Sequence, residues 1–189
     1  MTSLTRQYAA ALRLLLALTV LLGVVYPAVV FGIGRAGLSG QADGSLVEQD
    51  GKVVGSSLLG QDFTGDQWFH GRPSASDYAG DTSGGSNLAA SSEDQVAAVA
   101  ERREAVARAE GSDAVPADAL TASGSGLDPH ISPAYADLQV PRVAKATGLD
   151  TAVVQRLVDA NTQDRVLGYL GAPRVNVLEL NLALARAAG

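Results

Sequence analysis

The sequence contains no cysteine, and only two of its 189 residues are histidines. The missing thiols exclude disulfide bonds, cysteine nucleophiles and zinc–thiolate sites. The two histidines, His70 and His130, stand among scattered carboxylates with no recognised metal-ligand spacing. We therefore expect no metal site. The length suffices for one domain of ordinary size plus an appendage.

The common nucleotide-binding and nucleophile signatures are missing too. The most suggestive loop, GSGLDPHIS at 124–132, lacks the lysine and the second glycine of a Walker A motif. It has Pro129 where a G-x-G-x-x-G turn needs its third glycine. Ser125 has glycine directly on both sides, which does not fit the G-x-S-x-G elbow of hydrolases. The residues of this loop therefore predict neither a nucleotide-binding site nor a hydrolase active site.

Charge is absent from residues 14–33, LLLALTVLLGVVYPAVVFGI. Twenty helical residues span about 30 Å, the thickness of the hydrocarbon core of a bilayer. Gly23 and Pro27 are tolerated in transmembrane helices. A cleaved signal peptide would have a shorter apolar run and a small-x-small site, which GIGRAGLSG at 32–40 does not provide. We predict an uncleaved anchor within residues 1–35, in contact with membrane lipid.

The charges beside the anchor predict its orientation. Arg6 and Arg13 precede the uncharged run, whereas Arg35 alone follows it closely. The positive-inside bias places the N-terminus in the cytoplasm. Residues 36–45 then form a linker and residues 46–189 an extracytoplasmic domain. The prediction is a single-pass protein of the cytoplasmic (inner) membrane.

Basic residues are scarce in the exported part. The first 35 residues hold three arginines and no acidic residue, which leaves 11 basic and 20 acidic residues, a net charge of −9, in residues 36–189. An acidic surface repels phosphate backbones, so we expect no nucleic-acid partner.

The patterns after the linker predict an α+β fold. Asp50-Gly51 between apolar pairs indicates a β-hairpin whose second strand runs on toward Leu59. Ser92 and Gln95 form a capping box for a helix ending at Gly111. A second helix starts after Ser132 and must kink or break near Pro141, and a third follows the Asp150 cap. The alternating leucines of 175–185 favour a strand that joins the hairpin in a small sheet, with a helix as the open alternative. These elements give one domain with about three helices.

The aromatic stretch at 63–88 shows no sustained helical or strand period in its apolar residues, and we expect it to be a long loop. Trp68, Phe69, Arg72 and Pro73 lie in it, and Trp and Arg are residue types that dominate interface energetics. We predict a docking surface there. The open alternative is that Trp68 and Phe69 pack inward and Arg72 braces the loop.

The loop TASGSGLDPHISP at 121–133 also has two interpretations. Ser125, His130 and a distant acid could meet in space as a hydrolytic triad. In the structural interpretation, Gly124 and Gly126 permit positive φ, Asp128 accepts backbone N–H groups in an Asx turn, and His130 bonds a carbonyl. This second interpretation explains more of the residues, and we expect a rigid, self-bonded connector.

Five ordered motifs resemble the family of C subunits of the Kdp potassium-transporting ATPases. They are GSSLLGQDF at 55–63, FHGRPSASDY at 69–78, SGGSNL at 83–88, TASGSGLDPHISPAYADLQVPRVA at 121–144 and GAPRVNVLELNLAL at 171–184. The resemblance covers nearly the whole chain. It makes Ser86 and Asn87, within SGGSNL, further candidate contact residues.

The resemblance implies an accessory, non-catalytic subunit of a potassium uptake pump. Its implied partners are a potassium-binding, channel-like subunit and a P-type ATPase subunit, which uses the ATP. The sequence agrees by omission, since it has neither a DKTGT phosphorylation motif nor a TVGYG-like filter. Members of the family are described as catalytic chaperones that raise the ATP affinity of the ATPase subunit. An extracytoplasmic domain could do so only indirectly, through its partners. An anchored hydrolase and an anchored sensor or binding module remain the alternatives.

Overall fold

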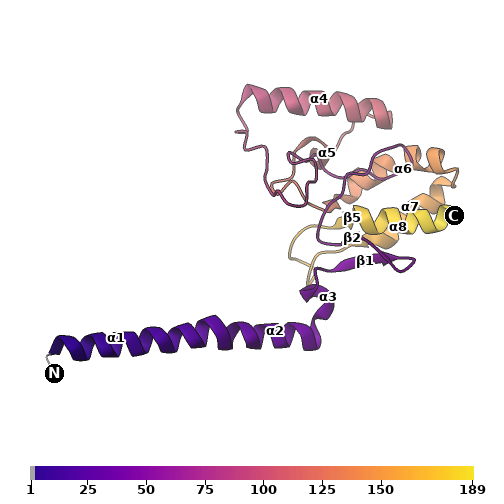
Figure 1. Ribbon diagram of the computed structural model, residues 1–189. Coiled ribbons are helices and arrows are strands. Elements are labelled where there is room, and N and C mark those ends of the chain that lie inside the picture. The colour runs from indigo at the N-terminus through magenta and orange to yellow at the C-terminus, as the bar shows by residue number, and fades with distance from the viewer. Residues whose placement is uncertain (1–2) are drawn as a thin grey trace. The chain divides into compact units, whose positions relative to one another are not determined.

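The computed structural model describes residues 3–189 (Figure 1). The chain divides into two compact units, with the boundary between Ser45 and Leu46. This boundary coincides with the expected start of the domain at residue 46.

The first unit is mainly one helical run. It consists of α1 (Ser3–Val20), the π-helical turn η1 (Leu21–Val25) and α2 (Tyr26–Gly37). The run Ser3–Gly37 is long and apolar enough to cross a membrane, and none of its side chains is buried in the structure. Within residues 36–45, the expected linker, α2 continues to Gly37 and a short helix, α3 (Ser39–Ala42), follows.

The second unit opens with the predicted hairpin. Strands β1 (Leu46–Gln49) and β2 (Lys52–Ser56) pair antiparallel. Asp50 and Gly51 have φ of 53° and 74°, so both turn positions take the left-handed conformation that the Asp-Gly pair predicted. Strand β2 ends at Ser56 and does not reach Leu59.

The helices begin and end at the predicted caps. Ser92 Oγ accepts the Gln95 N–H at the start of α4 (Glu93–Glu110), and Gly111 in the left-handed region ends that helix. A short helix, α5 (Ala117–Leu120), precedes the loop at 121–132. Ser132 caps α6 (Pro133–Thr147) and Asp150 caps α7 (Thr151–Asn161). Helix α6 does not break at Pro141: the buried side chains of Val140 and Val143 hold both sides of the proline in the core.

The C-terminal strand was predicted wrongly. Only β5 (Arg174–Asn176) is extended, and it lies between β3 (His130–Ile131) and β4 (Thr162–Gln163) in a three-stranded antiparallel sheet, separate from the hairpin. Helix α8 (Val177–Ala188) follows, capped by Asn176. Its buried residues Val177, Leu180, Asn181 and Leu184 follow helical spacing, and this burial outweighs the apparent alternation of the leucines.

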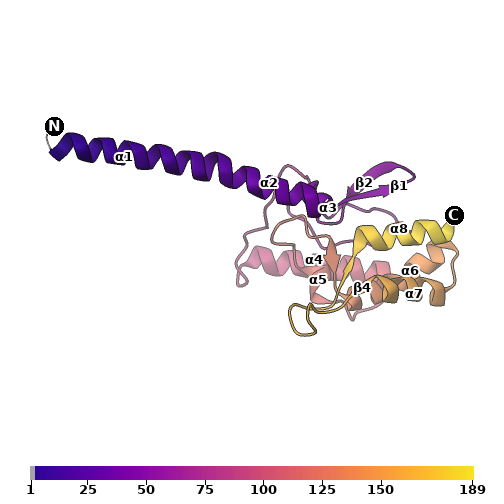
Figure 2. The same ribbon diagram turned by 90° about the horizontal axis from the view of Figure 1, so that it is seen from below.

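The core lies where α6, α7 and α8 pack beside one another, as both views show (Figure 2). It contains valines from α6 and α7, leucines from α8, and Phe69 from the long irregular segment. Helix α4 contributes no fully buried residue. This α+β architecture, with small sheets and several helices, confirms the expected fold class.

Candidate interaction site

The loop at 121–132 folds back on its own backbone. Ser123 Oγ accepts the Gly126 N–H at 3.1 Å, and Ser125 Oγ accepts the Leu127 N–H at 3.1 Å. Asp128 Oδ1 accepts the His130 N–H at 3.0 Å, which is the predicted Asx turn. The loop is therefore the self-bonded connector that its composition indicated, although the His130 ring faces the Asp128 carboxylate and not the expected carbonyl.

Three other motif segments attach to this loop through backbone hydrogen bonds. Gly60 donates to Leu127 O at 2.8 Å, and Gly84 donates to Ser125 O at 2.8 Å. Ser123 donates to Pro73 O at 2.9 Å. Segments that are 40 to 70 residues apart in the sequence thus meet at one junction, and the loop is its centre.

Glycine is required at the closest approaches of this junction. Gly126 has φ of +71°, and a Cβ atom there would lie 2.8 Å from Gly84 O. A Cβ on Gly85 would lie 3.0 Å from Gly124 O. The backbones pass so closely that side chains at these positions would separate the two segments.

Arg72 braces the junction from the aromatic stretch. Its Nη1 lies 3.2 Å from Asp128 Oδ2, and its Nη2 donates to Thr121 O at 3.3 Å. Its Nε is buried without a partner. The hydrogen bond with the His130 side chain holds the pKa of Asp128 below its usual range, with Arg72 acting in the same direction. Asp128 is therefore a carboxylate at neutral pH, and the bracing interpretation of Arg72 agrees with the structure.

The hydrolytic arrangement is not formed. Ser125 Oγ contacts Ser123 Oγ at 3.2 Å and the Leu127 N–H, whereas His130 Nδ1 faces Asp128 Oδ1 at 3.4 Å. No hydrogen bond joins Ser125 to His130 in the part of the chain that the structure describes. A nucleophile must lie within hydrogen-bond reach of its base, so these contacts provide no activated serine.

Phe69 and Trp68 have different environments. Phe69 is fully buried in the core, so it does not belong to a docking surface and has a structural role instead. Trp68 is half-buried and packs against Phe63, with ring centroids 6.0 Å apart. Arg72 and Pro73 are also half-buried. The prediction of a surface role therefore persists for Trp68 and Pro73 but not for Phe69, and Arg72 has the bracing role described above.

Buried amides hold the segment around Phe69, and the sequence analysis missed them. Asn181 of α8 accepts the Phe69 N–H and donates to Phe69 O, both at 2.9 Å. Gln139 of α6 accepts the His70 N–H at 2.7 Å and donates to His70 O at 3.2 Å. Both side chains are at most 1% exposed. A polar residue on the apolar face of each helix was the available signal.

An ion pair completes this attachment. Arg142 Nε lies 2.9 Å from Glu110 Oε1, and the two side chains are only 8% and 2% exposed. Arg142 Nη1 also donates to Asp66 O at 2.7 Å and Trp68 O at 3.0 Å. One guanidinium thus joins the end of α4, helix α6 and the aromatic stretch.

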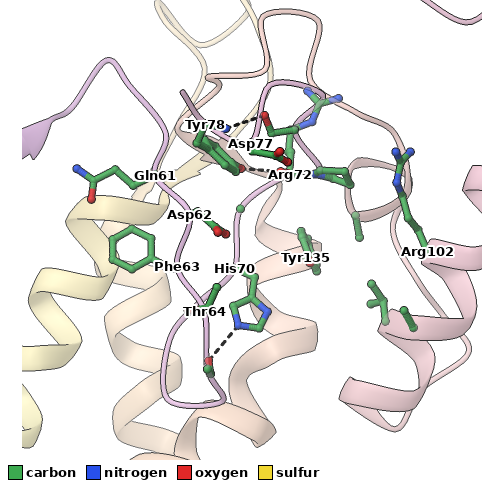
Figure 3. Close-up of a pocket in the computed structure, with 17 residues that line it drawn as sticks. Gln61, Asp62, Phe63, Thr64, His70, Arg72, Asp77, Tyr78, Arg102 and Tyr135 are labelled. Atoms are coloured by element: carbon green, nitrogen blue, oxygen red, sulfur yellow. Dashed lines mark hydrogen bonds between the residues drawn. The ribbon is translucent and has the colours of Figure 1, made fainter. Parts of the chain in front are cut away.

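A groove of about 470 Å³ opens between the aromatic stretch and α4 (Figure 3). His70 and Tyr135 line it, between the segment that carries Asp62 and the helix that carries Arg102. Burial, and next Arg142, lower the pKa of His70, so its ring is neutral at pH 7. Burial raises the pKa of Tyr135, and that of Tyr78 to about 12. The neutral aromatic groups here suit binding or packing better than acid–base chemistry.

The SGGSNL segment presents an exposed edge beside the junction. Ser86 and Asn87 are both exposed, and Asn87 has φ of 53°. Ser83 Oγ and the Gly84 N–H, just before them, bond to Ser125 O. The junction therefore holds this edge in place, and Ser86 and Asn87 are available for contact.

No group of His, Asp or Glu with metal-ligand geometry occurs among residues 3–189.

Comparison with known proteins agrees with the motifs. Residues 8–186 match the family KdpC, described as K+-transporting ATPase, c chain. The chain is 54% identical to a protein of Kineococcus radiotolerans over 193 residues, which cover 100% of this chain and 97% of that protein. It is 50% identical to a protein of Caldanaerobacter subterraneus subsp. tengcongensis, over 92% of this chain and 91% of that protein. Both relatives are named potassium-transporting ATPase KdpC subunit. With a match of this extent, the chain belongs to the KdpC family.

Proposed function

We propose that this chain is an accessory, non-catalytic subunit of an ATP-driven potassium pump. The observation that carries the proposal is the family match over residues 8–186, with relatives named as subunits of a potassium-transporting ATPase. The engagement of Ser125, Asp128 and His130 in their own loop supports a structural role for that motif. The membrane-crossing helix supports a place beside integral membrane subunits.

Within that role, we assign the chain to assembly and stability of the complex. Its partners are the channel-like potassium-binding subunit and the P-type ATPase subunit. The exposed Ser86 and Asn87 and the half-buried Trp68 and Pro73 provide the contact surface. No nucleotide binds to this chain; any effect on ATP affinity is transmitted through the partner subunits.

The orientation of the chain is part of the proposal. Two arginines precede the uncharged run and one follows it closely, which supports a cytoplasmic N-terminus and an external second unit. A reporter that is active only outside the cytoplasm, fused after Gly189, tests this. An inactive reporter, with an active cytoplasm-only reporter at the same position, contradicts the orientation and reopens direct ATP contact.

The test of function uses cells whose own copy of this gene is deleted. We expect the tagged chain to copurify with the other pump subunits and to restore growth at limiting potassium. In membranes, its removal should abolish potassium-stimulated ATPase activity through loss of the assembled complex. Normal growth and assembly without the chain would contradict the proposal, as would purification of the chain alone from cells that make the whole pump.

A matched pair of variants tests whether Trp68 belongs to the contact surface. Trp68→Ala should weaken copurification while leaving the chain folded, because the exposed part of the indole is lost. Val96→Ala removes an apolar side chain from exposed α4, 61% accessible, and should leave copurification unchanged. Equal copurification of both variants with the wild type excludes Trp68 from the contact and leaves Ser86 and Asn87.

A further inference from the structure

The segment between β4 and β5 carries a cluster of exposed apolar side chains. Val166, Leu167, Tyr169 and Leu170 are 53%, 76%, 69% and 49% exposed. In Figures 1 and 2 this segment stands out from the rest of its unit as a loop. Single exposed leucines are common, but four large apolar side chains within five residues mark an interaction surface.

The loop, residues 164–172, is a preformed turn. Val166 and Leu170 form an isolated antiparallel bridge, with hydrogen bonds of 3.0 and 2.9 Å in the two directions. Gly168 donates to Arg165 O at 3.0 Å. Leu167, at the tip, has φ of 56°, a conformation that favours glycine. The most exposed leucine of the cluster is thus held outward in a costly conformation instead of being turned toward the core.

The position of the loop in the chain restricts what can cover it. The spanning helix ends at Gly37 and the second unit begins at Leu46. The eight residues between them reach at most about 29 Å when fully extended. The second unit is therefore tethered close to a bilayer surface at all times, and a lipid surface is the apolar phase that is always within reach.

The charge along the loop fits an anionic lipid surface. Residues 36–189 carry a net charge of −9, but this loop contains Arg165 and is followed by Arg174, and Asp164, at its base beside Asp137 and Asp159, is the only acidic residue between positions 160 and 178. Arginine beside an apolar tip can pair with lipid phosphates while the tip enters the interface. Tyr169 is of the amphipathic type that gathers at the headgroup level. The hydrogen bonds that close the turn satisfy some of its backbone N–H and C=O groups, and this favours its entry into a membrane interface, where water is scarce.

We propose that the loop 164–172 inserts its apolar tip into the headgroup region of an anionic bilayer and fixes the orientation of the second unit relative to the membrane. The anchor holds the unit near the bilayer, and the loop provides a second point of contact. This proposal rests on the spanning helix and not on the proposed pump function, so either can fail alone.

The absence of cysteine allows a direct test with the full chain in nanodiscs. Leu167→Cys carries an NBD fluorophore, and the discs contain phosphatidylglycerol with or without a doxyl-labelled lipid. We expect a blue-shifted emission that the doxyl lipid quenches. Val96→Cys, an exposed apolar position on α4 (61%, against 76% for Leu167), is the matched control and should give an aqueous, unquenched signal with the same probe.

A second change separates insertion by the loop from insertion by the probe. Leu170→Asp in the Leu167→Cys background should abolish most of the quenching, since the charged side chain opposes entry. Replacing phosphatidylglycerol by phosphatidylcholine should reduce it, because the arginines lose their anionic partners. Quenching that is unchanged by both the Leu170→Asp substitution and the exchange of lipid would overturn the proposal.

The same probe detects a protein occupant. If the fluorophore at 167 is aqueous in discs that hold this chain alone, the lipid proposal fails. If it then becomes buried, but not quenched by doxyl lipid, when the other pump subunits are present, the loop docks on a protein surface. Quenching in discs of the chain alone supports the lipid contact.

Discussion

Residues 63–78 and 164–172 both lie outside the named helices and strands, yet their surroundings are opposite. The first segment is held by side chains of distant helices: Asn181, Gln139 and Arg142 bond to its backbone. The second segment bonds mainly to itself and exposes its apolar side chains. Irregular backbone thus becomes part of the core only where other elements supply hydrogen-bond partners for it.

Of the substitutions considered, removal of Arg142 should have the largest effect on the stability of the attachment of residues 63–78. Arg142→Ala leaves the Glu110 carboxylate buried and two carbonyls of the segment unbonded, so we expect a loss of about 3–5 kcal/mol in the free energy of unfolding. Denaturation of the full chain in detergent can be followed by Trp68, its single tryptophan. The control Arg108→Ala breaks an exposed pair with Glu104 and should cost about 0.5 kcal/mol or less. Equal effects would mean that the buried pair is not what fixes the segment.

Asn181→Ala should have the next largest effect. It removes both bonds to Phe69 and leaves a buried N–H and C=O unpaired, which costs about 2–3 kcal/mol. Asn161→Ala loses one bond to Leu157 O within its own helix and should cost about 1 kcal/mol or less. The rate of hydrogen exchange at the Phe69 amide should rise in Asn181→Ala and stay unchanged in Asn161→Ala.

Ser125→Ala tests the connector role. The change removes the acceptor of the Leu127 N–H and should cost about 1 kcal/mol in the free energy of unfolding. No catalytic activity should be lost, because the serine hydroxyl only takes part in hydrogen bonds of the loop. Hydrolysis of ester or phosphate substrates by the purified wild-type chain, abolished in Ser125→Ala, would contradict the non-catalytic assignment.

The stability contribution of Asp128 should depend on pH. Its folded pKa lies below the unfolded value of about 3.9, so its contribution is present above that value and is lost as the pH falls through the folded pKa. Asp128→Asn should therefore be less stable than the wild type at pH 7, and the difference should shrink below about pH 4. A difference that is constant down to acid pH would show that the charge has no part in it.

Leu167→Ser should have the smallest effect on folding. The side chain is 76% exposed, so the free energy of unfolding should stay within about 0.5 kcal/mol of the wild type. A clear destabilisation would show that the tip packs within the chain, and the contrast between the two segments would then be lost.

Local chemistry in the sequence predicted much of this fold. The Asp50-Gly51 turn, the Ser92 and Ser132 caps and the Asx turn at Asp128 all depend on neighbours within a few residues. The C-terminal helix was only the alternative to a strand because Leu178, Leu180, Leu182 and Leu184 satisfy a period of two, and only the packing showed that Leu182 is less buried than the others.

The candidate site could be predicted only in part. The motifs named the segments that meet, but not the bonds between Asn181 and Phe69, which are 112 residues apart. Such contacts depend on how the helices pack, and no local pattern records them. Phe69 was assigned to a surface because an aromatic residue in a loop suits an interface and a core equally well.

The π-helical turn Leu21–Val25 has a consequence for the spanning helix. A π-turn holds one residue more than a regular turn, and each residue advances a helix by about 100°. Side chains of α2 therefore point about 100° away from where a continuous α-helix would place them. A neighbouring helix that follows one face of α1 meets a different side of α2, so the two halves of the anchor can recognise two different neighbours. Deleting one residue from Leu21–Val25 would merge the two faces into one.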